Sequence, residues 1–201
     1  MRKIVTATFI TLDGVMQAPG GSKEDTSEGF KYGGWQMDWN TPDEVADDIM
    51  AKFMATPFDL LLGHRTYDIW AAFWPHNKDE PTWGKRFDRA TKYVVSHKSF
   101  KLSWDNSELI TGNVVNELKK LKNSDGPDLH VWGSSKLIQT LLKHNLIDQM
   151  HIWTYPITIG TGKKLFAEGT LPERFKPIAG KITKTGVVYA IYEPTVPLKP
   201  A

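Results

Sequence analysis

Two short apolar runs, each stopped by a glycine and followed by a helical stretch, constrain the fold of this chain most strongly. Residues 58–62 (FDLLL) lead into Gly63, and residues 129–132 (LHVW) lead into Gly133. Runs of this kind are typical of parallel strands buried on both faces. Because parallel strands are connected by crossovers that usually contain a helix, the pattern predicts an α/β sheet.

Further strands and helices extend this pattern. Strands are expected at 3–10, 92–96, 108–111 and 149–155, and helices at 64–70, from Asn113 and at 134–143. Thr41 is expected to cap another helix, which begins at Pro42 and ends before Pro57. Residues 174–184 and 187–193 predict a hairpin joined at Thr185-Gly186. The expected fold is one domain over 1–193 with a mostly parallel mixed sheet and a C-terminal antiparallel hairpin, followed by an extended proline-rich tail at 194–201.

Composition excludes several classes of function. The 201 residues suit a single domain, and their net charge of +2 predicts no nucleic-acid or anionic-membrane partner. With no cysteine, the chain forms no disulfide, iron–sulfur cluster or thiolate zinc site. No histidine pair has metal-ligand spacing, so no metal is expected. No apolar run has the length of a membrane span and the first residues lack a signal-peptide core, so we expect a cytoplasmic protein.

The two glycine-led helix starts indicate phosphate binding. A helix start exposes unpaired N–H groups and the positive end of the dipole, and glycine lets a phosphate approach the backbone. Thr66, Ser134 and Ser135 add hydroxyl donors. Either site alone is often only a turn, but two in one small sheet suit the diphosphate of a dinucleotide. The Gly-x-Gly-x-x-Gly pattern of ordinary Rossmann domains is absent after the first strand.

Several segments resemble the dihydrofolate reductase superfamily. Residues 60–67 (LLLGHRTY) resemble its Gly-Arg-x-Thr-Tyr segment, and residues 131–137 (VWGSSKL) resemble its second glycine motif. Residues 146–150 (LIDQM) and 156–162 (PITIGTG) look like the ending of the reductase domain of riboflavin biosynthesis, the RibD C-terminal family. Residues 11–14 (TLDG) are similar to the start of that domain.

The resemblance implies a dihydrofolate-reductase-like three-layer α/β/α fold, NADPH as hydride donor and a homodimer. It also implies an NADPH-dependent reductase of a small heterocycle, pteridine- or riboflavin-precursor-like, similar to 5-amino-6-(5-phosphoribosylamino)uracil reductase. The residues that match cofactor-binding positions are Gly63, His64, Arg65, Thr66, Ser96, His97, Lys98, Gly133, Ser134, Ser135, Lys136 and Leu137. His64 and His97 stand where family members often carry arginines that hold the 2′-phosphate of NADPH.

The substrate side is expected near the first loop. The resemblance places Asp13 and Gly14 beside the nicotinamide and the substrate. Residues 11–41 carry many glycines without a period, which is typical of a lid. Trp35, Trp39 and Trp70 are expected to form a flat apolar wall for a ring-shaped ligand, although packing is the alternative for each.

Two carboxylates are candidates for catalysis. Asp13 is the first, with turn formation by Asp13-Gly14 as its alternative. Asp47 is the second, in roughly the register where dihydrofolate reductases carry their substrate carboxylate, with a solvated acidic helix start as its alternative.

Three other functions stay open. The chain could be a non-catalytic dinucleotide- or ligand-binding module of the same fold. It could use a bound flavin in place of a diffusing nicotinamide, or its tryptophan-rich surface could serve assembly.

Overall fold

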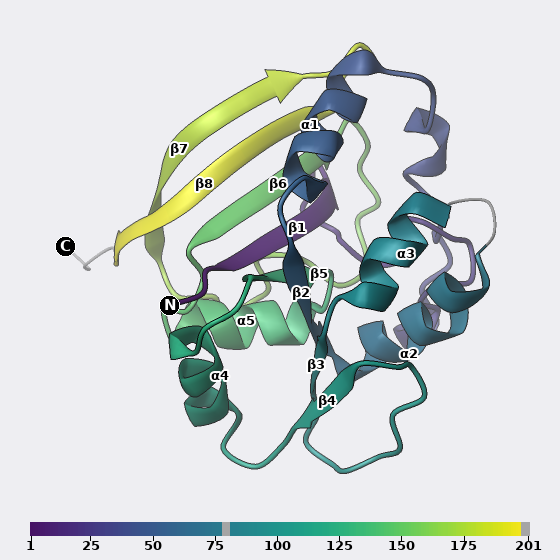
Figure 1. The fold of residues 1–201 in the computed structure, drawn as a ribbon. Coiled ribbons are helices and arrows are strands. Elements are labelled where there is room, and N and C mark those ends of the chain that lie inside the picture. Colours follow the sequence, from purple (N-terminus) through teal and green to yellow (C-terminus); the bar gives the residue numbers. More distant parts are fainter. Residues whose placement is uncertain (78–80, 198–201) are drawn as a thin grey trace.

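One sheet of eight strands organises the part of the chain that the computed structural model describes, residues 1–77 and 81–197 (Figure 1). Its strand order is β4-β3-β2-β5-β1-β6-β8-β7. All neighbours from β4 to β6 pair in parallel, whereas β8 runs antiparallel to both β6 and β7. The predicted mostly parallel sheet with a C-terminal antiparallel hairpin is therefore confirmed. The strands are β1 (Ile4–Thr11), β2 (Phe58–Gly63), β3 (Lys92–Val95), β4 (Ser107–Ile110), β5 (Asp128–Trp132), β6 (Gln149–Tyr155), β7 (Glu173–Ile182) and β8 (Val188–Pro197).

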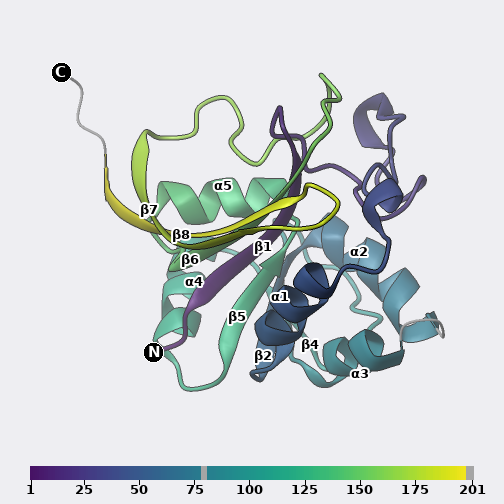
Figure 2. The same ribbon diagram turned by 90° about the horizontal axis from the view of Figure 1, so that it is seen from above.

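Helices cover both faces of this sheet and give the three-layer arrangement expected from the resemblance. They are α1 (Glu44–Met54), α2 (His64–Phe73), α3 (Pro81–Arg89), α4 (Val114–Asn123) and α5 (Ser135–Lys143). Side chains of α1, α2 and α3 join one core, and side chains of α4 and α5 join a second. Figure 2 shows α5 on one side of the sheet and α1, α2 and α3 on the other. Alternate residues of each buried strand supply the two cores, as Leu60 and Leu61 of β2 do.

The cap of α1 differs from the prediction. Asp43, and not Thr41, is the N-cap, and its Oδ1 accepts hydrogen bonds from Val45 N (3.0 Å) and Ala46 N (3.3 Å). Its Oδ2 also accepts from Lys184 N at 2.6 Å, in the turn between β7 and β8. A carboxylate directly before the first helical residue reaches the free amides of the first turn, which Thr41 is too far back to do.

Two other boundaries differ. Helix α3 was not expected from the sequence, and β8 ends at Pro197 and not at 193. The last residue of β8 that pairs with β6 is Tyr192, so the prolines beyond it lie where β8 has a neighbour on one side only. Proline is tolerated more easily there, because on one side of β8 no partner strand needs an N–H donor. Residues 198–201 of the predicted tail lie outside the described part of the chain.

The loop after β1 packs against the segment that follows the carboxyl end of β6. It contains the short 3₁₀ helices η1 (Ser27–Gly29) and η2 (Met37–Trp39); a third, η3 (Trp74–His76), follows α2. Its first residues form backbone hydrogen bonds with the segment after β6, including Leu12 N to Ile157 O and Met16 N to Lys163 O, both 2.8 Å. The contact is close, because a Cβ at Gly162 would lie 2.8 Å from the ring of Phe30. Among the described helices, none has the length and apolarity needed to cross a membrane.

Candidate functional site

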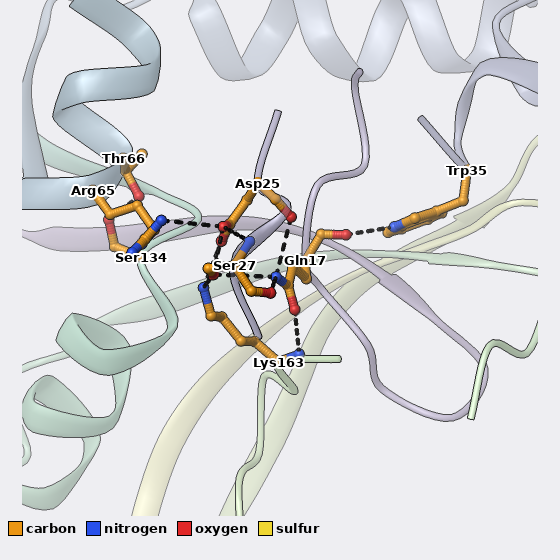
Figure 3. A network of polar contacts seen from close by, with 8 residues as sticks. All are labelled: Gln17, Asp25, Ser27, Trp35, Arg65, Thr66, Ser134 and Lys163. Carbon is orange, nitrogen blue, oxygen red and sulfur yellow. Dashed lines mark hydrogen bonds and ion pairs between the residues drawn. The ribbon is translucent and has the colours of Figure 1, made fainter. Parts of the chain in front are cut away.

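The two glycine-led helix starts meet through one side chain. Strands β2 and β5 are parallel neighbours, so Gly63 and Gly133 leave the sheet at the same edge. The Ser134 hydroxyl accepts a hydrogen bond from Gly63 N at 2.9 Å and donates one to Thr66 Oγ1 at 2.7 Å. The structure thus joins the two motifs, with Ser134 and Thr66 side by side (Figure 3).

Both helix starts keep donors available. No described side chain caps the N-terminus of α2 or of α5. Gly133 and Ser134 both have positive φ, +61° and +62°, and this sharp turn carries the Ser134 hydroxyl back to Gly63. Uncapped first turns with hydroxyls beside them favour an anion. The same arrangement removes one expected donor, because the Gly63 amide is already bonded to Ser134.

The remaining residues of the second motif contribute differently. Leu137 is buried in the core under α5, so only its backbone can face a ligand. Lys136 is exposed, and Ser135 is half-buried at the first position of α5. A Cβ built on Gly133 would meet only Thr66, at 3.9 Å, so open space lies in front of this glycine.

Three residues predicted for the adenosine end gather after β3. The ring of His64 stacks on Phe100 with 3.8 Å between centroids, and its Nδ1 lies 3.4 Å from Ser96 Oγ. Its Nε2 lies 3.3 Å from a carboxylate oxygen of Asp68. Ser96 is buried and donates to Lys98 O at 2.8 Å, while the side chains of His97 and Lys98 are exposed. A carboxylate therefore lies beside the histidine that stands where the resemblance implies a phosphate-binding arginine.

Asp13 serves the contact between the first loop and the segment after β6. Its carboxylate accepts hydrogen bonds from Thr11 Oγ1 (2.6 Å), Ile159 N (3.2 Å) and Gly160 N (2.7 Å). The Thr11 bond, aided by the two amides, holds the pKa of Asp13 below its ordinary value. Asp13 is therefore ionised at neutral pH and cannot serve there as a proton donor. Its predicted catalytic role stays a prediction, whereas its positioning contacts are part of the structure.

Asp47 lies on the exposed side of α1. The inward face of that helix carries Ile49 and Phe53, and Phe53 packs on the rings of His130 and Trp132. The catalytic role predicted for Asp47 stays a prediction, and the contacts of α1 give it no support.

The predicted aromatic wall divides into buried and half-exposed rings. Trp35 is buried, donates from Nε1 to Gln17 O at 2.8 Å and packs edge-on against Tyr155. Trp35 also borders an open depression formed by residues 32–35 and 157–159. Trp39 and Trp70 are half-buried, with Trp39 near Tyr155 and Trp70 near Trp132. Gly14, at φ +82°, has no atom within 4 Å of an added Cβ.

Trp132 is a central residue that sequence reasoning did not single out. It precedes Gly133, is 5% exposed, and its Nε1 has no hydrogen-bond partner in the described part of the chain. Five aromatic rings surround it: Phe9, Phe53, Trp70, Trp83 and Phe87. Its position at the end of a strand, directly before the glycine motif, was the signal available in the sequence.

Residues of the first loop also reach the glycine motifs. Asp25 forms ion pairs with Arg65 on α2 and with Lys163 after β6, and Gln17 and Ser27 complete the network (Figure 3). Of these, only Arg65 was predicted as a site residue. Lys163 directly follows the motif at residues 156–162, which was a signal in the sequence. Asp25 lies in a segment that has no pattern to indicate a functional residue.

Comparison with known proteins gives consistent matches over the whole length. The family described as "RibD C-terminal domain" matches residues 2–189. The "Uncharacterized protein YyaP" of Bacillus subtilis (strain 168) is 27% identical over 196 residues, covering 95% of this chain and 94% of that protein.

Three solved structures share the fold. One from Shewanella sp. PV-4, described as a "Putative riboflavin biosynthesis protein", aligns with a TM-score of 0.71 and 23% identity over 98% of this chain and all of its own. A pyrimidine reductase-like protein of Corynebacterium diphtheriae gives a TM-score of 0.60 and 13% identity over 97% and 92% of the two chains. Dihydrofolate reductase of Enterococcus faecalis, complexed with NADP(H), gives 0.57 and 12% over 96% and 97%.

Proposed function

Because the chain belongs to the RibD C-terminal domain family, we propose that it is an NADPH-dependent reductase of a small planar heterocycle. The Ser134 bridge between Gly63 and Thr66 carries this proposal, since it brings two uncapped helix starts to one edge of the sheet. Such an edge, at the carboxyl ends of parallel strands, is where ligands bind in open α/β sheets. The dinucleotide complex of the Enterococcus faecalis reductase adds support through the shared fold.

The residues of the two motifs have separate tasks in this proposal. The first-turn amides of α5 and the hydroxyls of Thr66 and Ser135 bind the diphosphate. His64 and Ser96 lie at the adenosine end, where the stacked rings of His64 and Phe100 form a flat surface. When bound, NADPH supplies the hydride, and the protein orients the nicotinamide and excludes water.

The substrate is proposed to lie against the aromatic residues beside Trp132. Phe9, Trp70 and Trp83 are half-buried, so they offer apolar faces to a ligand. Trp132 Nε1 is buried and has no hydrogen-bond partner among the described residues, at a cost of about 1–3 kcal/mol, and a ligand that reached it with a carbonyl oxygen or ring nitrogen would satisfy this donor. These features suit an uncharged heterocycle. In a riboflavin precursor they would contact the heterocyclic base, and they offer nothing that would bind its phosphate.

Asp13 is proposed to shape this site without donating a proton. Its hydrogen bonds to the amides of Ile159 and Gly160 hold the segment after β6 against the first loop. Trp39 and Tyr155 pack where that loop meets β6. The homodimer and the cytoplasmic location implied by the resemblance and the composition remain predictions.

A titration that follows NADPH fluorescence tests the proposal. We expect binding in the micromolar range and oxidation of NADPH with at least one compound of a panel of pteridines, flavin precursors and quinones. Absence of binding by NADPH and by NADH would overturn it.

A non-catalytic dinucleotide-binding module is the second candidate. One observation favours it: Asp13 accepts hydrogen bonds that hold the first loop against the segment after β6, and Asp47 lies on the exposed side of α1, so the contacts of neither predicted carboxylate point to a catalytic role. Tight binding of NADPH without oxidation across the panel would select this candidate.

A further inference from the structure

A carboxylate lies between two cations beside the glycine motifs (Figure 3). Asp25 Oδ2 is 2.5 Å from Lys163 Nζ, and Asp25 Oδ1 is 3.4 Å from Arg65 Nη1. The side chains of Asp25 and Lys163 are only 10% and 16% exposed, whereas that of Arg65 is 63% exposed. The first loop, α2 and the segment after β6, which are far apart in sequence, are therefore in contact at the Asp25 carboxylate.

Neighbouring groups fix this carboxylate in its ionised form. Ser27 donates to Asp25 Oδ1 from its amide (3.1 Å) and its hydroxyl (2.6 Å). Gln17 ties the same loop down, because its Nε2 donates to Asp25 O and its Oε1 accepts from Lys163 N. Burial raises the pKa of Asp25, but the bonds from Lys163 and Ser27 outweigh it and leave the pKa below its ordinary value.

A negatively charged group of a ligand could pair with Arg65 and Lys163 as the Asp25 carboxylate does. Arg65 is in the first turn of α2 and precedes Thr66, which bonds to Ser134. Arg65 thus joins the Asp25 carboxylate to the uncapped start of α2, and the bond between Thr66 and Ser134 joins that start to the start of α5. A diphosphate entering between α2 and α5 would compete with Asp25 for Arg65 and Lys163.

We propose that Arg65 and Lys163 form a subsite for the diphosphate of the dinucleotide, which the Asp25 carboxylate occupies until the ligand displaces it. This inference rests on the proposed function and adds Lys163 to its binding residues. Displacement releases the loop around Asp25 from Arg65, so the same exchange couples cofactor binding to movement of this loop. The competition weakens the apparent affinity, because only the fraction of molecules with Asp25 released can bind.

A set of variants separates this exchange from a purely structural ion pair. Asp25→Asn removes the competing charge and keeps the shape of the side chain. Ser27→Ala loosens the same loop while keeping the carboxylate, and Asp38→Asn removes an exposed charge from the same loop as a control for net charge. Lys163→Gln is made in the Asp25→Asn background, where Lys163 no longer has a carboxylate to neutralise.

The readouts are dissociation constants for NADPH, by fluorescence, and for inorganic pyrophosphate, by calorimetry, together with thermal unfolding of each variant. Asp25→Asn is expected to bind both ligands roughly tenfold more tightly, as the loss of one charged competitor allows. Adding Lys163→Gln is expected to weaken binding by roughly tenfold again, since a charge-assisted bond to phosphate is lost. Ser27→Ala and Asp38→Asn are expected to change these dissociation constants by less than about threefold, which is clearly smaller than the tenfold effects expected for the other variants.

The failures are distinguishable. If the wild type binds NADPH while Asp25→Asn and the double variant bind it with the wild-type constant, the exchange is overturned and the proposed function stands. If Asp25→Asn gains affinity for pyrophosphate but no variant binds either dinucleotide, the anion subsite is supported and the proposed function is overturned. A gain in Ser27→Ala equal to that in Asp25→Asn would assign the effect to loop loosening and overturn the exchange.

Discussion

The Ser134 hydroxyl accepts a hydrogen bond from the Gly63 amide at 2.9 Å, although the two residues are 71 positions apart in the chain. Gly63 is the last residue of β2, Ser134 follows the end of β5, and these two parallel strands are neighbours. The bond therefore depends on the sheet order, and it fixes the distance between the starts of α2 and α5. The predictions about the cofactor depend on this geometry.

Replacement of Gly133 by valine is expected to weaken dinucleotide binding by at least about tenfold, because the added side chain would fill the open space in front of the motif. Within the protein, a Cβ there meets only Thr66, at 3.9 Å, which is ordinary van der Waals contact. The measurement is the dissociation constant for NADPH, with circular dichroism to check folding.

Gly112→Val is the matched control for backbone strain. Gly112 has φ +73°, close to the +61° of Gly133, and a Cβ there has no atom within 4 Å. Both variants are expected to lose about 1–3 kcal/mol of stability through this φ. Only Gly133→Val should lose affinity, and equal affinity in the two variants would show that the second motif is just a turn.

Asp68→Asn is expected to shift the cofactor preference toward NADPH by a few fold. The Asp68 carboxylate lies 3.3 Å from His64 Nε2, at the position that the family resemblance assigns to the 2′-phosphate. Its charge would repel that phosphate, although solvent screens it because the side chain is 59% exposed. The ratio of the dissociation constants for NADPH and NADH measures the shift.

The exposed Asp125 provides the control, since Asp125→Asn changes the net charge equally at a distance from the site. His64→Arg should raise the preference for NADPH further, because a guanidinium binds phosphate with two parallel bonds. An unchanged ratio in Asp68→Asn would place the 2′-phosphate elsewhere.

The sheet could be predicted from sequence because its strands are marked locally. The buried runs before Gly63 and Gly133 have the length and composition of parallel strands, and the turn at Gly186, with φ +85°, requires the glycine that predicted it. Helix α3 was missed because its apolar residues are few. Trp83 and Phe87 lie one turn apart on it, but Gly84 between them is typical of a helix break.

The candidate site was predictable only in part, and the reason is physical. The motif residues carry a local signal, since a strand, a glycine and a hydroxyl are adjacent in sequence. The contact of Asp25 with Lys163 joins residues 138 positions apart, and no periodicity in the loop indicates it. Only the packing of the loop on the segment after β6 brings these charges together.

Asp59→Asn is expected to destabilise the protein by about 3 kcal/mol, because it leaves a buried cation without its counter-ion. Arg2 is 2% exposed, pairs with Asp59 and donates from Nε to Pro127 O. Its guanidinium also lies over the ring of Tyr93. Urea unfolding measures the loss, and the asparagine keeps an acceptor for Thr91 N, which bonds to Asp59 at 2.9 Å.

Asp48→Asn is the exposed counterpart. Asp48 pairs with Lys52 at 2.8 Å and with Lys181 at 3.1 Å on the surface, where solvent screens the charges, so its loss should cost much less stability than the loss of Asp59. Equal costs for Asp48→Asn and Asp59→Asn would mean that burial of the Arg2 pair does not matter.

Stability is expected to fall as the pH falls from 6.5 toward 4, because two histidines are buried in neutral form. Burial lowers the pKa of His130 to about 3, with a further contribution from His151, and burial lowers the pKa of His151 to about 4. An unfolded histidine titrates near the ordinary value of about 6.5, so in this range the unfolded chain binds more protons than the folded one. For each of these histidines, the free energy of unfolding then falls by about 1.4 kcal/mol per pH unit below 6.5.

His130→Phe isolates this effect from the titration of carboxylates. His130 lies between the rings of Phe53 and Phe58, both stacked on it at about 4.5 Å, so a phenyl ring can take its place. Its Nδ1 has no hydrogen-bond partner among the described residues, so the substitution removes no bond from that atom. Thermal unfolding at pH 7 and pH 5 should show a smaller difference for His130→Phe than for the wild type, by about 2 kcal/mol. His144→Gln, which alters an exposed histidine, should keep the wild-type difference, and the same difference in all three proteins would show that His130 does not resist protonation.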